Sequence, residues 1–196
     1  MNYNLAKQEL LSGTTKNCTD FFKENNYLLE YGYSLILQGR LKEAESVMRS
    51  LDSLRAKWAL SLTQFMQGYV EHFPTSFQIR NFLEIDINLL ILAKQQDSIN
   101  YILGGADILY SINCESYKYL ARVFMNNGYF NVAKTYLDKA EAKTENDPEL
   151  YYMITMYHIT LKEYRDALHA LNRCLEFLPE YYPALRLKNT LTSFIS

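Results

Sequence analysis

Two stretches of this chain share one pattern of small and large side chains. The first is "GYFNVAKTYLDKAEAKTE" at residues 128–145, and the second is "KEYRDALHALNRCLEFLP" at residues 162–179. In this alignment Ala167 falls on Ala133, and large apolar residues recur three and four positions away, which indicates amphipathic helices. The small residues would let a neighbouring helix lie close, because a bulky side chain there would hold the two helices apart.

The pattern continues into a helix that precedes each stretch, so one unit is a pair of helices joined by a turn. The unit at 80–113 is degenerate, because Ile87 and Ile99 stand where the other units have small residues. Over the whole chain the pattern predicts four units of equal length, at 25–58, 80–113, 114–147 and 148–181.

This pattern resembles the tetratricopeptide repeat (TPR) family, whose unit is a 34-residue helix–turn–helix. The resemblance implies an all-α protein, a right-handed α-solenoid of TPR-like repeats with terminal capping helices. Residues 1–24 are then expected to form the N-terminal capping helices. Residues 182–196 are expected to form the C-terminal capping helix.

The register of the units breaks once, at residues 59–79. These residues are too few for a unit and predict one irregular helix, with Trp58 at its start packed inward. Pro74 should stop that helix near Phe73, with a new helix directly after it. Further along, Gly104 and Gly105 predict a weak point or kink inside a helix.

Charge and apolar runs argue against a nucleic-acid-binding protein, a signal peptide and a membrane span, and cysteine spacing indicates reduced thiols. The net charge is −2, and residues 114–196 hold ten acids and ten bases, which argues against a nucleic-acid-binding surface. The start of the chain has no apolar segment typical of a signal peptide, and the longest apolar run, at 87–93, is far too short to span a bilayer. The three cysteines form no CxxC pair, which predicts reduced thiols in a cytoplasmic protein.

The search for catalytic chemistry finds no motif for a nucleophile, a phosphate loop or a dinucleotide site. The histidines are His72, His158 and His169, and no two have the spacing of metal ligands. His158 is expected to pack in the core and His169 to face outward. The sequence therefore predicts no catalytic residue, no cofactor and no metal, and indicates a protein that is not an enzyme.

The TPR resemblance also implies a concave surface, lined by the first helix of each unit, that binds extended peptides or partner helices. The family's carboxylate clamp uses Lys, Asn and Arg residues, and Lys118 matches one of its positions. Arg122 stands where the clamp has Asn, and Met153 stands where the next unit should supply another Asn, so the clamp is incomplete. Helical phase predicts these groove residues: Tyr33, Leu37, Asn88, Lys118, Arg122, Asn126, Tyr152, Met156 and Arg186.

The sequence thus predicts a non-enzymatic scaffold for a protein or peptide partner. A positive groove would favour an acidic partner, but Lys118 and Arg122 could instead pair with Glu115 and Glu149 as a solvated face. One alternative is a small TPR chaperone for a secreted or aggregation-prone client, and another is an enzyme on a helical-repeat scaffold. Self-association through the last helix is a further alternative.

Overall fold

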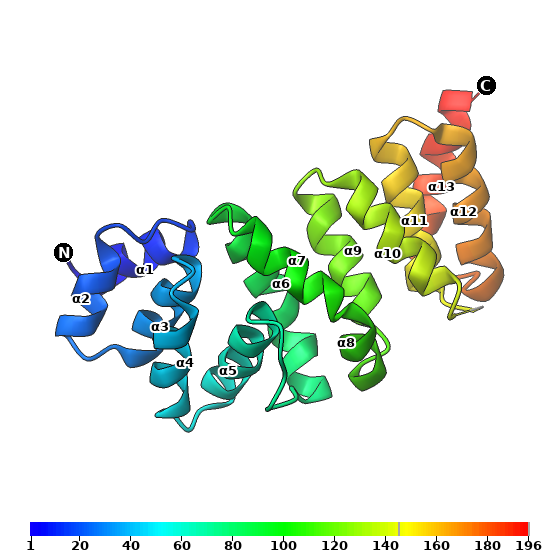
Figure 1. Cartoon of the computed structure of the whole chain (residues 1–196). Helices are drawn as coiled ribbons and strands as arrows, with labels where there is room; N and C mark the ends of the chain where they lie inside the picture. The colour runs from blue at the N-terminus through cyan, green and yellow to red at the C-terminus, as the bar shows by residue number, and fades with distance from the viewer. Residues whose placement is uncertain (145, 196) are drawn as a thin grey trace. The chain divides into compact units, whose positions relative to one another are not determined.

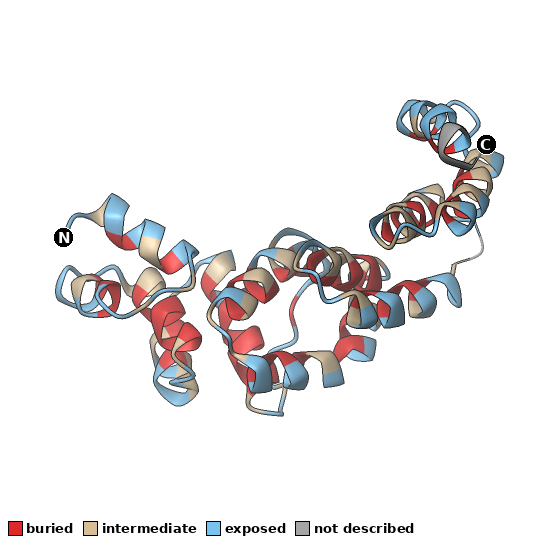
Figure 2. Cartoon of the chain, turned by 90° about the horizontal axis from the view of Figure 1, so that it is seen from above, coloured by how far each residue is buried: buried red, intermediate tan, exposed pale blue. Residues whose placement is uncertain are grey.

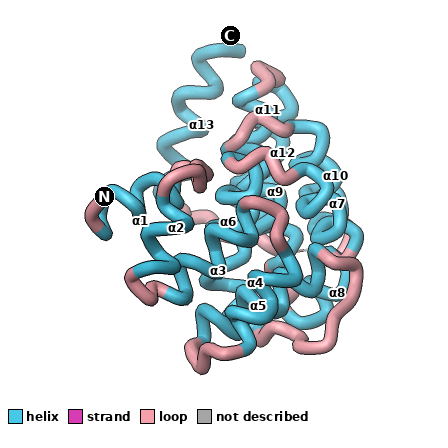
Figure 3. The backbone as a smooth tube through the Cα atoms, turned by 60° about the vertical axis from the view of Figure 1, so that its left-hand side comes forward, coloured by secondary structure: helices cyan, strands magenta, loops and turns pink. Residues whose placement is uncertain are grey.

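The structure, a computed structural model of the chain, describes residues 1–144 and 146–195, with side chains up to Thr192. The described residues form 13 α-helices and no β-strand, which confirms the all-α prediction (Figure 1, Figure 3). None of these helices is both long enough and apolar enough to cross a membrane. In chain order they are α1 Tyr3–Leu11, α2 Cys18–Glu24, α3 Leu28–Leu37, α4 Leu41–Arg49, α5 Leu54–Met66, α6 Ser76–Leu92, α7 Gln96–Gly104, α8 Ala106–Ile112, α9 Ser116–Asn126, α10 Phe130–Glu141, α11 Pro148–Thr160, α12 Tyr164–Phe177 and α13 Tyr182–Ile195.

The chain divides into two compact units, residues 1–119 and residues 120–196, and the boundary falls within α9. Most helices bury the side that packs on neighbouring helices, whereas α3 over residues 31–37 and α5 over residues 58–66 are buried on all sides (Figure 2). In the second unit α11 and α12 pack side by side, and α13 packs on α12. Ala184 and Leu191 of α13 join the core formed by Tyr151, Leu171 and Cys174.

Seven of the described helices end in the same kind of left-handed turn. In each turn the residue after the left-handed one donates its backbone N–H to the carbonyl five residues earlier, at 2.9–3.1 Å. This hydrogen bond satisfies a carbonyl that the end of the helix would otherwise leave without a partner. The left-handed residues are Gly13, Asn26, Gly39, Gly68, Lys94, Gly128 and Lys162. The last three are evenly spaced in the sequence, one predicted unit apart.

The helix after α4 differs from the one predicted. α5 begins at Leu54, because the side chain of Ser53 accepts the N–H of Ala56 and caps the helix. It ends at Met66, so the prediction of a helix that reaches the vicinity of Phe73 is wrong. The physical reason is Gly68, whose φ of +81° ends the helix well before Pro74 can act.

Other local predictions near this segment are confirmed. Trp58 is only 1% exposed, as expected for an inward-facing side chain. α6 begins directly after Thr75, whose hydroxyl accepts the N–H of Gln78 in a capping box. Gly104 and Gly105 do mark a weak point, but the helix stops there and a new one starts at Ala106. A Cβ on Gly105 would lie 2.7 Å from the Phe65 ring, so glycine lets that ring lie close to the backbone.

Small residues lie at the helix contacts where the sequence pattern placed them. Ala133 and Ala167 are completely buried, and so is Ala121. A Cβ on Gly32 would lie 2.5 Å from the terminal methyl carbon of Met48, on the helix that follows. The three alanines are thus enclosed by neighbouring side chains, and a Cβ on Gly32 would require the flexible end of Met48 to move.

Candidate functional site

The nine predicted groove residues are divided between the two compact units. The first unit contains Tyr33, Leu37, Asn88 and Lys118. The second contains Arg122, Asn126, Tyr152, Met156 and Arg186. In the second unit Tyr152 and Arg186 line one pocket.

This pocket is an open depression of about 330 Å³ between α11 and α13. Tyr152 contributes an aromatic wall and packs edge-to-face on Tyr181, with the ring centroids 5.3 Å apart. Burial, and then the neighbouring Tyr181, raise the pKa of the Tyr152 hydroxyl, so this group remains a hydrogen-bond donor at neutral pH. The guanidinium of Arg186, an exposed residue, lies 5.8 Å from the ring of Tyr182. The remaining lining residues are Pro183, Leu187 and Thr190.

The other predicted groove residues of the second unit have different surroundings. Arg122 donates to a carboxylate oxygen of Glu149 at 2.8 Å and lies 3.7 Å from the sulfur of Met153. Asn126 is exposed at the end of α9, and Met156 is half-buried on α11. The charge of Arg122 is thus already balanced by an acidic side chain of the same unit, which was the alternative left open by the sequence.

In the first unit the predicted groove residues are mostly covered. Tyr33 is 6% exposed and Leu37 is 3% exposed, so both offer little surface to a ligand. Lys118 is also buried, and its ammonium lies 2.5 Å from a carboxylate oxygen of Glu115. Asn88 is half-buried on α6. Helical phase alone does not show which side of a helix a neighbouring helix covers, and three of these four predicted groove residues are buried.

Tyr33 belongs to a buried polar cluster that the sequence analysis did not anticipate. The carboxylate of Asp86 accepts the hydroxyl of Tyr33 at 3.0 Å and the indole N–H of Trp58 at 2.5 Å. It also accepts a hydrogen bond from the guanidinium of Arg55. That guanidinium lies over the Tyr33 ring at 4.7 Å and over the Phe82 ring at 4.4 Å. The cluster joins α3, α5 and α6.

The arrangement of this cluster indicates a structural role. Burial raises the pKa of Asp86, whereas Arg55 and the two neutral donors favour its charged form. Burial, and then the charge of Asp86, also raise the pKa of Tyr33 well above 10, so its hydroxyl stays a donor. Three donors converge on one fully covered carboxylate, so the cluster holds helices together rather than presenting a reactive group to solvent.

A second polar side chain, Gln64, fixes the loop after α5. It is completely buried, and its side-chain oxygen accepts the backbone N–H groups of Glu71 and His72 at 3.0 and 2.9 Å. This loop, with α4 and α5, borders a pocket of about 700 Å³ whose lining includes Leu54 and Phe73. On the same unit, a separate pocket of about 470 Å³ lies beside Phe65 and Tyr101.

The histidines are placed partly as expected. His169 is exposed, which confirms that it faces outward. His158 packs edge-to-face on Tyr157, with centroids 5.4 Å apart, but its side chain remains 18% exposed. Its Nδ1 lies 2.7 Å from a carboxylate oxygen of Glu163, so it takes part in a polar pair at the surface rather than in the core alone.

No protein-family model matches the chain, and a search of curated proteins gives no match.

Proposed function

We propose that this chain is a non-enzymatic protein-binding scaffold, built as an α-solenoid of TPR-like units, that binds a peptide segment or a partner helix. The repeated turns support the architecture, because Lys94, Gly128 and Lys162 are left-handed and evenly spaced in the sequence. Each follows the first helix of a predicted unit, so three consecutive units use the same turn. Such regularity is typical of repeat proteins, in which each unit packs on the next.

The packing of the helix pairs also supports this proposal. Ala133 and Ala167, at equivalent positions of two units, are completely buried in helix contacts. Close packing of this kind keeps the two helices of a unit rigid relative to each other. A rigid unit presents the side chains of its first helix in a fixed arrangement, which lowers the entropy cost of binding an extended partner.

One observation carries the functional part of the proposal: Tyr152 and Arg186 line the same open pocket of the second unit. Tyrosine and arginine are among the residues that contribute most to protein–protein binding energy, because they combine large contact area with hydrogen bonding. The pocket is also flanked by apolar carbon from Pro183 and Leu187. It suits an apolar side chain of a partner, with a carboxylate near Arg186.

The charges in the second unit limit how acidic the partner should be. Arg122 is already paired with Glu149, so it adds little positive field at the surface. Arg186 is exposed beside the pocket. We therefore propose one acidic contact, at Arg186, together with an apolar anchor at Tyr152, rather than a strongly acidic ligand.

The test is selection of peptides from a random phage library on the full-length protein, followed by fluorescence anisotropy with the selected peptides. Arg186→Ala and Tyr152→Ala should each weaken binding by about tenfold or more, the loss expected for central contact residues. Lys188→Ala is the matched control for the charge, and Tyr129→Ala is the control for an exposed tyrosine. The proposal fails if no peptide is selected, or if the controls weaken binding as much as the pocket variants.

A further inference from the structure

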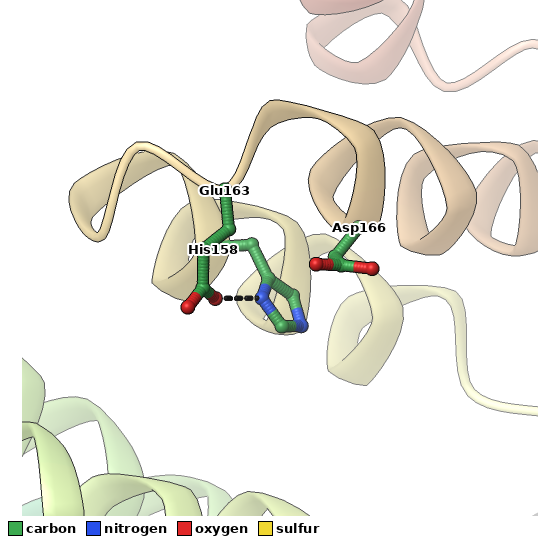
Figure 4. Close-up of side chains that lie close together, drawn as sticks. All are labelled: His158, Glu163 and Asp166. Carbon is green, nitrogen blue, oxygen red and sulfur yellow. Dashed lines mark hydrogen bonds and ion pairs between the residues drawn. The ribbon is translucent and has the colours of Figure 1, made fainter.

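Three side chains that can bind metal ions lie together where α11 joins α12. They are His158 in the last turn of α11, Glu163 directly before α12, and Asp166 in its first turn. One nitrogen of the imidazole and one oxygen of each carboxylate all lie within 4.8 Å of one another. Figure 4 shows the imidazole of His158 between the two carboxylates.

The left-handed turn at Lys162 produces this cluster. Its φ of +63° reverses the chain, and the backbone N–H of Glu163 donates to the carbonyl of His158 at 2.9 Å. This hydrogen bond brings Glu163 back beside the imidazole, although the two are five residues apart. Asp166 follows one helical turn later and so lies on the same side of α12. Spacing between histidines gives no sign of this cluster, because two of its three members are carboxylates.

The hydrogen bond between His158 and Glu163 also prepares the imidazole for a metal ion. When Nδ1 carries the proton and donates it to Glu163, the lone pair is on Nε2. Metal-binding histidines commonly have this arrangement, with a carboxylate on the nitrogen that does not bind the metal. Glu163 can thus orient the ring or supply an oxygen ligand itself.

A pocket at the same place provides room and further donors. It has a volume of about 220 Å³, and His158 and Asp166 line it together with His169 and Glu141. Arg173 lines it too, but its guanidinium donates to Glu176 at 2.6 Å and so has an acidic partner. The pocket therefore combines imidazole nitrogens with carboxylate oxygens.

We propose that the α11–α12 turn binds one divalent metal ion of the Zn²⁺ class through His158 and Asp166, with Glu163 beside the imidazole and His169 lining the same pocket. Mixed nitrogen and oxygen donors suit Zn²⁺, Co²⁺ and Ni²⁺, whereas Mg²⁺ and Ca²⁺ prefer oxygen alone. Zinc bonds to nitrogen and oxygen are about 2.0–2.2 Å long, so small rotations of these side chains would bring the ligand atoms onto one ion. The ion would join two helices of the second unit.

The experiment titrates Zn²⁺ into the full-length, metal-stripped protein, in competition with a chromogenic chelator. The background is Cys114→Ser, because the exposed thiol of Cys114 could bind zinc by itself. We expect one equivalent of Zn²⁺ per chain, with His158→Gln and Asp166→Asn each weakening binding at least about tenfold. Zn²⁺ should also raise the melting temperature of the parent protein, because it binds only the folded state, and should not do so in these variants.

The matched control is His72→Gln in the first unit. His72 also lies beside a glutamate, with its Nδ1 3.6 Å from a carboxylate oxygen of Glu71, but it does not belong to the cluster of three possible ligands. Its replacement should leave the affinity for Zn²⁺ unchanged. Circular dichroism checks that each variant is folded. The proposal is overturned if the parent protein shows no saturable binding, if Mg²⁺ competes equally, or if all variants bind Zn²⁺ alike.

Discussion

The hydroxyl of Tyr33 donates a hydrogen bond to the carboxylate of Asp86 at 3.0 Å, across 53 positions of sequence. Both side chains are buried, so this contact fixes α3 against α6 in the first unit. Tyr33→Phe removes one donor and leaves a covered carboxylate with one partner fewer. We expect a loss of about 1.5–3 kcal/mol in the free energy of unfolding, as is typical of hydrogen bonds to charged groups.

Asp86→Ala should cost more, because it leaves Arg55, Trp58 and Tyr33 without their common acceptor. Breaking a buried ion pair by removing one member typically costs about 3–5 kcal/mol, and partial exposure of Arg55 places this case near the lower end. Urea denaturation measures both variants, with Tyr31→Phe on the same helix as the control. Equal stability of Asp86→Ala and the parent protein would show that the cluster does not hold these helices.

The second prediction concerns the small residues of the repeat. Ala133→Leu and Ala167→Leu each insert a larger side chain where none of the alanine surface is exposed. Overpacking of this kind typically costs about 1–3 kcal/mol. Thermal melting would measure the loss, and Ala142→Leu, at an exposed position after α10, should have little effect. If the two buried variants melt like the parent protein, the register of the repeat is wrong.

The third prediction concerns the left-handed turn after α9. Gly128 has a φ of +79°, and a Cβ placed on it would meet no atom within 4 Å. Gly128→Ala therefore tests backbone strain alone, which for a non-glycine residue in this region costs about 1–2 kcal/mol. Gly104→Ala is the matched control, because a Cβ placed on Gly104 would also meet no atom within 4 Å, but the φ of Gly104 is not positive. Gly104 is the last residue of α7, so alanine should be neutral or slightly stabilising there. Equal destabilisation of the two variants in urea would contradict this account.

The sequence was sufficient to predict most of the helical pattern. Spacing of three and four between apolar residues is a local signal, and it correctly indicated an all-α chain with inward-facing Ala133 and Ala167. At the end of α5, glycine was a better guide than proline to where the helix stops. Pro74 suggested where α5 should end, but Gly68 had already ended it, just as Gly39 ends α3.

The surroundings of the predicted groove residues and the cluster at His158 were harder to predict, because they depend on contacts between helices. Helical phase predicted Tyr33 as a groove residue, whereas the contacts that bury this side chain come from α5 and α6. It also predicted Tyr152 and Arg186 as groove residues, and these two line one pocket. The cluster at His158 depends on the left-handed backbone of Lys162. Lysine rarely adopts this conformation, so the residue type at position 162 did not predict it.

The last prediction concerns acid stability in the first unit. Burial opposes the charge of Glu45, but hydrogen bonds from Tyr69, Gln67, Arg49 and Gln64 outweigh it and lower its pKa from an ordinary 4.5 to about 2. The hydroxyl of Tyr69 donates at 2.6 Å and the amide of Gln67 at 3.0 Å. A carboxyl group with a lowered pKa stabilises the folded state above its unfolded pKa, and this contribution disappears as the pH falls toward its folded pKa.

Glu45→Gln should therefore destabilise the protein at neutral pH, and the difference from the parent protein should shrink between about pH 4.5 and pH 2. Urea denaturation at a series of pH values measures this difference. Glu24→Gln, at an exposed position of α2, shows what the loss of one surface charge does alone. Because Gln67 and Tyr69 follow directly after α5, loss of the charge should also loosen the loop that begins there, and hydrogen exchange at its amides should quicken. A stability difference that stays constant from pH 7 to pH 2 would show that the charge of Glu45 does not hold this loop.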